Sequence, residues 1–196
     1  YEATLEPRWL DEAAWITERV VELFWDDVDG IFHDGPKDGE VLAVRARDLM
    51  DNATPSGNSL AVELLIRSAH LFGGERHRDI AHRVLDREVG FMARFPAAFG
   101  RLLSVLDRTV ADPVEIAIVG ARDDARTLAL LQAALKPYIP NRTIAGIAPG
   151  EHLAHELPVL QGRDGGAEPA AYVCERYACQ APVSDATALA EQLNGG

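Results

Sequence analysis

The sequence predicts a mainly α-helical protein that ends in a small α/β segment. Apolar residues recur at helical spacing through most of the chain up to residue 106, and short β-type runs alternate with helices after residue 113. The composition, 47% hydrophobic and 26% charged over 196 residues, is that of an ordinary globular protein. The change of pattern near Asp112-Pro113 predicts a helical domain over residues 1–111 and a small α/β domain over residues 112–196.

The helical part contains four candidate helices. A first helix is expected over residues 11–24, with Asp11 as a capping residue, and a second over residues 59–72, with Ser59 or Asn58 as its cap. The second helix is apolar around most of its circumference, since its polar residues form one narrow stripe. The third, over residues 76–95, has a broad polar face that carries His77 and His82, and both are expected to be solvated, as is His70 on the second helix. A fourth is expected after Pro96.

The order of these helices indicates a layered arrangement. An enclosed helix is followed, after a short turn, by a half-exposed one, and consecutive helices with short turns lie antiparallel. Alternation of enclosed and peripheral helices is typical of a two-layer helical ring or solenoid, and a globular bundle gives the same pattern. Between the first two helices, residues 30–33 and 41–44 predict two extended segments that form a loose hairpin.

The C-terminal part begins with a strand–helix–strand unit. Strands are expected at residues 115–119 and 142–147, joined by a helix capped by Asp123 or Asp124, and a connection of this length favours parallel pairing. A third strand is expected at residues 170–174 and a last helix over residues 185–193, with Ser184 or Asp185 as its cap. The turn after the first strand carries only Gly120 of a GxGxxG pattern, so no nucleotide or other cofactor is expected.

Composition also excludes several classes of partner. The 19 Lys and Arg and 31 Asp and Glu give a net charge of −12, which repels phosphate backbones and anionic lipids. We therefore expect neither nucleic-acid nor membrane binding, and no apolar run approaches the ~20 residues of a membrane span. The chain shows no secretory segment, and two cysteines are too few for a secreted disulfide framework, so a cytoplasmic location is expected.

The densest group of polar residues, residues 45–59, directly precedes the most apolar helix. One interpretation is a capping loop built from side-chain turns. The other is the rim of a ligand pocket, because capping requires only one or two such residues. On the second interpretation Asp48, Asp51 and His33 are candidate acid/base residues, with Asp34 and Glu63 as candidates for a second acid. The candidate ligand-binding residues are Arg45, Arg47, Asn52, Ser56, Asn58 and Glu63.

The two cysteines, Cys174 and Cys179, allow three interpretations. Packing thiols are favoured, and a reversible disulfide is an alternative in which Arg176 is the only nearby residue expected to favour a thiolate. A zinc site with His152 and His155 is the third, but this spacing matches no standard zinc signature and no metal is expected.

Several blocks of the sequence together resemble a known family. They resemble the C-terminal part of the thioredoxin-domain-containing family that includes the spermatogenesis-associated thioredoxin-like proteins. The resemblance spans nearly the whole chain and is carried in order by residues 30–32, 44–48, 51–59, 118–120, 138–141, 157–158 and 171–174, with Cys179 and Pro182.

The resemblance implies a fold and two candidate functions. Such proteins carry an N-terminal thioredoxin-like domain followed by an α/α toroid similar to six-hairpin glycosidases and N-acylglucosamine 2-epimerases, so the chain is expected to be a C-terminal fragment with a partial toroid. The implied function is carbohydrate binding or processing by an isomerase, epimerase or glycosidase-like site. The alternative is a non-catalytic module that scaffolds or regulates the thioredoxin-like domain of the parent chain. A partial toroid would expose apolar faces, which predicts self-association.

Overall fold

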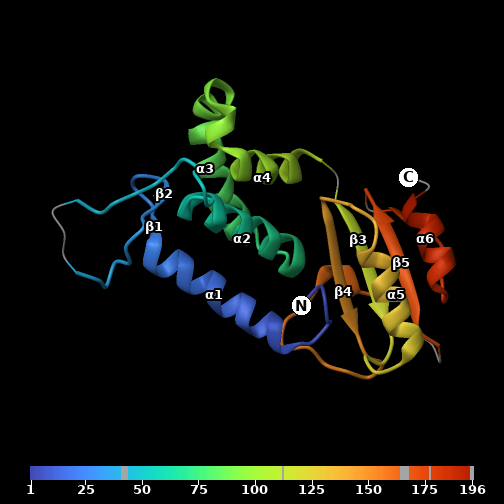
Figure 1. The fold of residues 1–196 in the computed structure, drawn as a ribbon. Helices are drawn as coiled ribbons and strands as arrows, with labels where there is room; N and C mark the ends of the chain where they lie inside the picture. Colours follow the sequence, from blue (N-terminus) through green and yellow to red (C-terminus); the bar gives the residue numbers. More distant parts are fainter. Residues whose placement is uncertain (41–43, 112, 164–167, 177, 195–196) are drawn as a thin grey trace. The chain divides into compact units, whose positions relative to one another are not determined.

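The computed structural model describes residues 1–40, 44–111, 113–163, 168–176 and 178–194 (Figure 1). The chain forms two compact units. Glu12–Val110 form the helical unit, whereas Tyr1–Asp11 together with Ala111–Gly196 form the α/β unit. The sequence predicts a boundary at residues 111–112 and places residues 1–11 in the helical domain, whereas here they belong to the α/β unit. The mainly helical class with an α/β segment is confirmed, and the toroid stays a prediction.

The helical unit contains α1 (Arg8–Phe24) from Glu12 onward, α2 (Gly57–Phe72), α3 (Glu75–Arg94) and α4 (Gly100–Val110), with a short 3-10 turn, η1 (Pro96–Ala98), before α4. Helix α2 packs against both α3 and α4. The core of the unit consists of Val21, Trp25, Phe32, Ala61, Val62, Leu65, Ile66, Ile80, Ala81, Val84, Leu85, Met92, Phe99, Leu102 and Val105.

The two ends of α2 are fixed by local chemistry. The Ser56 hydroxyl accepts a hydrogen bond from the Ser59 amide at 3.1 Å, so the helix begins at Gly57 and its cap is Ser56 rather than the predicted Ser59 or Asn58. Gly73 ends the helix at φ 77°, a left-handed conformation that glycine adopts without strain. The side of α2 around Leu60 is less enclosed than its apolar sequence predicts, since Leu60 is 48% exposed.

The extended segments pair differently from the predicted hairpin. Strand β2 (Ile31–Phe32) pairs antiparallel with β1 (Trp25–Asp26), which directly follows α1. The other predicted arm, residues 41–44, lies outside the described residues except for its last position. The residues directly after α1 thus supply the partner strand, and the Trp25 and Phe32 rings pack at a tilt of 54° with centroids 5.1 Å apart.

Helix α3 is the outer helix that its polar face predicts, with two differences. Val89 is 52% exposed, whereas Glu88 is buried at 2% exposure in the position expected for an apolar residue. His77 is half-buried rather than solvated, with its Nε2 2.9 Å from the Glu18 carboxylate. A one-residue rotation of the buried stripe accounts for the exchange of Val89 and Glu88.

The α/β unit is built on a sheet with strand order β4-β3-β5-β6. Figure 1 labels the first three of these strands. The predicted parallel strand–helix–strand unit is confirmed by β3 (Val114–Val119), α5 (Ala125–Leu135) and β4 (Arg142–Ile147). Strand β5 (Ala170–Glu175) pairs antiparallel with β3, and the two-residue β6 (Ala178–Cys179) pairs antiparallel with β5. Helix α6 (Ala186–Asn194) packs on α5, and the 3-10 turn η2 (Pro158–Leu160) packs on β3 and β4.

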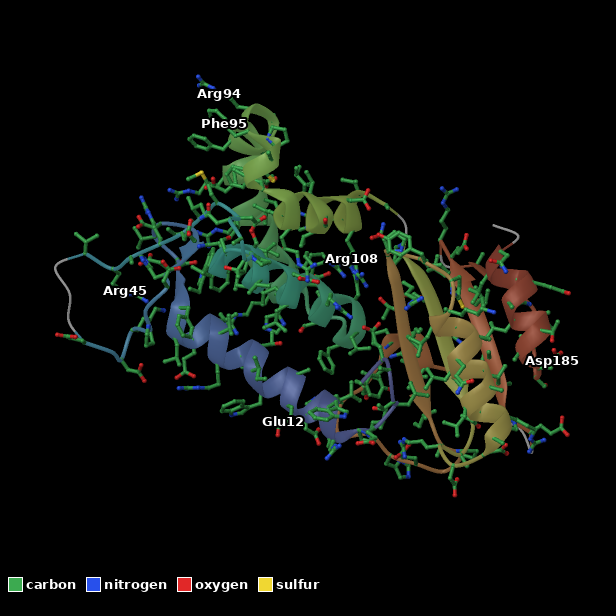
Figure 2. The ribbon with its side chains drawn as sticks, in the orientation of Figure 1. Glu12, Arg45, Arg94, Phe95, Arg108 and Asp185 are labelled. Carbon is green, nitrogen blue, oxygen red and sulfur yellow. A yellow bond between two sulfur atoms is a disulfide. The ribbon has the colours of Figure 1, made fainter. Side chains whose placement is uncertain are left out.

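The helix caps of this unit follow the sequence prediction. Asp124 accepts a hydrogen bond from the Arg126 amide at 2.8 Å and caps α5. Asp185, labelled in Figure 2, accepts hydrogen bonds from the Thr187 and Ala188 amides at 2.9 and 3.0 Å and caps α6. The core consists of Leu5, Ile116, Ile118, Leu130, Leu131, Ala134, Ile144, Ala171, Val173 and Leu189.

The first residues of the chain lie along β4. The Tyr1 hydroxyl donates to the Gly146 carbonyl at 2.8 Å and accepts from the Gly146 amide at 2.9 Å. The Glu2 carboxylate accepts from the Ile144 amide at 3.0 Å. Burial raises the pKa of Tyr1 to about 12, so the hydroxyl keeps the proton that it donates.

Among the described helices, none is both long and apolar enough to cross a membrane.

Candidate functional site

The polar segment at residues 45–59 is held by hydrogen bonds within the protein. Asn58 is 1% exposed, and its side chain spans two backbone segments. Its Oδ1 accepts from the Phe32 amide at 2.8 Å, while its Nδ2 donates to the Phe32 carbonyl at 2.8 Å and to the Asp48 carbonyl at 3.0 Å. The Asn58 side chain thus satisfies both the backbone amide and the backbone carbonyl of Phe32, as the backbone of a paired strand does, and joins α2 to β2.

Both carboxylate oxygens of Asp51 also accept hydrogen bonds from backbone amides. Its Oδ1 accepts from the Ser56 amide at 2.9 Å, and its Oδ2 accepts from the Arg101 amide at 2.7 Å, at the start of α4. Burial alone would raise the pKa of Asp51, but these amide donors outweigh it and hold the pKa below its usual value of 3.8. Asp51 therefore connects the segment before α2 to α4 as an anion.

The other predicted site residues also have internal or surface partners. Arg45, labelled in Figure 2, donates to the Gly35 carbonyl at 2.6 Å, and Arg47 lies 3.2 Å from the Asp29 carboxylate. Asp48 and Asn52 are exposed, and the Asp48 carboxylate accepts from the Met50 amide at 3.1 Å. Glu63 lies 2.6 Å from the Arg101 guanidinium. This pattern is that of the capping interpretation, and the catalytic and ligand-binding roles of these residues stay predictions.

The structural role of Asp51 can be measured directly. We expect Asp51→Asn to destabilise the helical unit by about 1–2 kcal/mol, because the amide offers one acceptor oxygen where the carboxylate offers two. Since the folded-state pKa is lowered, this contribution is complete above the pKa of the unfolded chain and is lost as the pH falls through the folded-state pKa. Urea unfolding at pH 7 measures the loss. The exposed Asp48→Asn is the matched control, and an equal effect of both substitutions would contradict the assignment.

A pocket of about 340 Å³ lies at the start of α2, and Gly57 of this segment is among its lining residues. It lies between the last turns of α1, the chain after β2 and the first turns of α2. Its walls are mostly apolar, and two polar side chains, His33 and Asp34, line it. The lining residues are Val20, Phe24, Phe32, His33, Asp34, Gly57, Leu60, Ala61 and Leu64.

His33 has an unusual environment for a histidine. The residue is 9% exposed, its Nε2 lies 3.4 Å from the Asp26 carboxylate, and its buried Nδ1 has no hydrogen-bond partner within the part of the chain that the structure describes. The Asp26 carboxylate fixes one ring nitrogen of this pocket-lining residue, and the other ring nitrogen is a buried polar atom without a partner among the described residues, which is rare in folded proteins.

A carboxylate pair lies on the Nε2 side of His33. Ligand atoms of Asp26, Asp29 and His33 lie within 4.8 Å of one another in the described structure. The Asp26 carboxylate already accepts from the Val28 and Asp29 amides at 2.9 and 3.0 Å, and these bonds lower its pKa. Asp29 is also paired with Arg47, so both carboxylates are engaged by protein donors.

Asp34 lies where α2 begins. A Cβ atom at Gly57 would lie 3.4 Å from the Asp34 Oδ1, so the carboxylate stands close to the first turn of the helix. Negative charge is favourable at a helix N-terminus. The exposed side chain of Asp34 and the buried ring of His33 are therefore adjacent polar groups at one end of an apolar pocket.

Sequence reasoning missed most of the pocket. Phe24, Leu60 and Leu64 have apolar helical positions that predict core residues, and no motif distinguishes a helix face that lines a pocket from one that packs. The adjacency of His33 and Asp34 in the sequence was the one available signal.

The cysteines of the α/β unit form a disulfide, so the prediction of packing thiols is wrong. Cys174 on β5 faces Cys179 on β6 in the strand register, and the two sulfurs are bonded. Because each sulfur is bonded to the other, this state excludes the alternative zinc site. His155 instead lies 3.2 Å from the Asp11 carboxylate.

Fold and site together define a two-unit protein: a helical unit with a small, mostly apolar pocket, and an α/β unit with a disulfide between β5 and β6. The chain is similar to a region of spermatogenesis-associated protein 20, with 32% identity to the human protein over 99% of this chain and 25% of the relative. The mouse and rat proteins of that name are each 31% identical over 99% of this chain. The chain thus spans about a quarter of the length of the curated relatives it matches. No family model matches the chain.

Proposed function

We propose that the helical unit is the ligand-binding region of a longer carbohydrate-binding or carbohydrate-processing protein, and that its site is the pocket beside His33 and Asp34. The observation that carries the proposal is that His33, whose buried Nδ1 has no partner within the described residues, is one of the two polar residues that line a pocket of about 340 Å³. A ligand hydroxyl that reaches this ring would supply the missing hydrogen bond.

The pocket chemistry suits a monosaccharide. Sugars present apolar C–H faces as well as hydroxyl groups, and here Phe24 and Phe32 offer aromatic surface while His33 and Asp34 offer hydrogen-bonding groups. A volume of about 340 Å³ is at the lower end of small-molecule pockets, which suits one sugar ring.

The same residues favour isomerase or epimerase chemistry over glycoside hydrolysis. Hydrolysis of a glycosidic bond ordinarily uses two carboxyl groups on opposite sides of the substrate. Among the described residues that line the pocket, Asp34 is the sole carboxylate, and Glu63, the other candidate, is paired with Arg101. One imidazole and one carboxylate are sufficient for proton abstraction and return.

Binding by a sugar panel tests the proposal. We expect one or more monosaccharides, titrated into the chain by calorimetry or followed by NMR shifts, to bind to the wild type. Asp34→Asn is expected to weaken that binding at least about tenfold, because a charged hydrogen bond is lost. Asp38→Asn is the matched control, since Asp38 is an exposed acid that does not line the pocket.

A negative result has a defined meaning. If no sugar in the panel binds, or if Asp34→Asn and Asp38→Asn bind equally well, the pocket is not a carbohydrate site. Asp34 is exposed, so its substitution is expected to change stability little, and loss of binding then reports on the ligand rather than on the fold.

A second candidate function is supported by a different observation. The polar segment at residues 45–59 is engaged by internal hydrogen bonds, and α1 and α2 carry exposed apolar residues, with Trp15 63%, Ile16 43% and Leu60 48% exposed. We propose on this ground that the chain, as the C-terminal part of its parent protein, can act as a non-catalytic module for a thioredoxin-like domain. On this proposal the apolar residues contact other parts of the parent or a second copy.

A further inference from the structure

The disulfide of the α/β unit has a feature that a purely structural crosslink does not require. The Arg163 guanidinium, through Nη2, lies 2.8 Å from the Cys174 sulfur and 3.1 Å from the Cys179 sulfur. A neutral disulfide is a weak hydrogen-bond acceptor, whereas a thiolate is a strong one. The cation is therefore placed where negative charge appears only after the bond between the sulfurs is broken.

Arg163 is held in this position by its surroundings. Its amide donates to the Leu160 carbonyl at 3.1 Å, which anchors the residue to the turn η2. Its guanidinium carbon lies 5.6 Å from the ring centroid of Tyr172 on β5, within the range of a cation–π contact. The sequence indicated Arg176 as the cation near the cysteines, whereas Arg163 is the residue whose guanidinium lies 2.8 Å from the Cys174 sulfur.

The two sulfurs differ in accessibility. Cys174 is 3% exposed, whereas Cys179 lies on the exposed two-residue strand β6 at the end of the strand order. An attacking thiolate approaches along the axis of the bond between the sulfurs, and it can reach the Cys179 sulfur from solvent. The Cys174 sulfur is then the leaving group.

We propose that Cys174 and Cys179 form an exchangeable redox pair that accepts two electrons from a dithiol, with Arg163 stabilising the leaving thiolate. A thiolate of the dithiol attacks the Cys179 sulfur, a mixed disulfide forms, and the bond between the two cysteines breaks with its electron pair on Cys174. The second thiol of the dithiol then loses its proton. It attacks the dithiol sulfur of the mixed disulfide and releases Cys179 as a thiolate.

The exchange is balanced. Two electrons and two protons pass from the dithiol to the cysteine pair, leaving the partner as a disulfide and this chain with two reduced cysteines. Arg163 contacts both reacting sulfurs and so acts directly on the exchange. Reduction is expected to leave the unit folded, because pairing of β5 with β3 and the packing of α5 and α6 do not depend on the disulfide.

Redox titration of the whole chain with dithiothreitol at pH 8 tests the proposal, with reduced thiols counted by alkylation and mass spectrometry. We expect Arg163→Gln to be reduced about ten times more slowly than wild type and to have a tenfold smaller equilibrium constant for reduction, a shift of about 30 mV to more negative potential. Arg163→Lys should restore most of both values. Arg126→Gln, which removes an arginine paired with Asp124, is the control.

Two further measurements separate this role from a structural one. With single cysteines, Cys174→Ser should react with iodoacetamide faster than Cys179→Ser, because it leaves the exposed sulfur. Circular dichroism should show that reduced wild type and Arg163→Gln are both folded. Equal rates and equal equilibrium constants for wild type and Arg163→Gln, or unfolding of the α/β unit on reduction, would overturn the proposal in favour of a structural crosslink.

Discussion

Asn58→Ala is expected to destabilise the helical unit by about 3 kcal/mol. The substitution leaves the Phe32 amide, the Phe32 carbonyl and the Asp48 carbonyl without the side-chain partner that they have now. Asn58 is 1% exposed, so water does not readily replace those bonds, and each buried polar group without a partner costs about 1–3 kcal/mol. The loss also frees β2 from α2, which is why the cost exceeds that of an ordinary cap.

Urea unfolding followed by tryptophan fluorescence measures this change, because Trp25 is buried in the same core. Asn52→Ala is the matched control: Asn52 is an exposed asparagine of the same segment, and its substitution should change stability by less than about 0.5 kcal/mol. A loss below about 1 kcal/mol for Asn58→Ala would show that the amide is not the link between α2 and β2.

Acid is expected to weaken the helical unit through His70. His70 is half-buried rather than solvated as the sequence predicts. Burial is the largest cause that lowers the pKa of His70 to about 4, followed by the positive charges of Arg108 and Arg78. Arg108 is labelled on α4 in Figure 2. In the unfolded chain the pKa returns to about 6.5. Between these two pKa values, the unfolded state binds a proton at His70 that the folded state does not. The contribution of neutral His70 to stability is therefore complete above pH 6.5 and is lost as the pH falls toward 4.

The expected size of this loss is about 2 kcal/mol, less than the full shift implies, because His70 is only half-buried and solvent screens part of the effect. His70→Gln removes the titration. Urea midpoints for wild type and His70→Gln, measured from pH 7.5 to pH 4, should therefore converge or cross as the pH falls. Parallel curves for the two proteins would show that His70 does not set the acid sensitivity.

The parts of the fold that the sequence predicts are those with strong local signals. The parallel pair β3 and β4 follows from two buried apolar runs on either side of a capped helix, and the end of α2 follows from Gly73-Gly74. Strand β2 lies within the extended segment predicted at residues 30–33, but its partner β1 was missed because a two-residue strand has no periodicity. The cap of α2 was misplaced by a few residues because Ser56, Asn58 and Ser59 are all good caps by type.

The candidate site shows a different limit of sequence reasoning. A high density of polar residues before an apolar helix suits both a ligand rim and a network of internal hydrogen bonds, and only coordinates show which atoms meet. Asn58 and Asp51 satisfy backbone groups of other segments, which no local pattern reveals. The contact of Arg163 with both sulfurs joins residues 11 and 16 positions apart and has no sequence signature.

The side chains of Tyr1 and Glu2 along β4 have a consequence for solubility. An open outer strand offers unpaired amides to any other extended chain and so can template polymerisation. Here the Tyr1 hydroxyl accepts from the Gly146 amide and the Glu2 carboxylate accepts from the Ile144 amide. These side chains occupy the edge of β4 without adding a new edge strand. The edge strand on the other side of the sheet, β6, is only two residues long. Both margins are thus poor templates, which protects the sheet from growing strand by strand into fibrils.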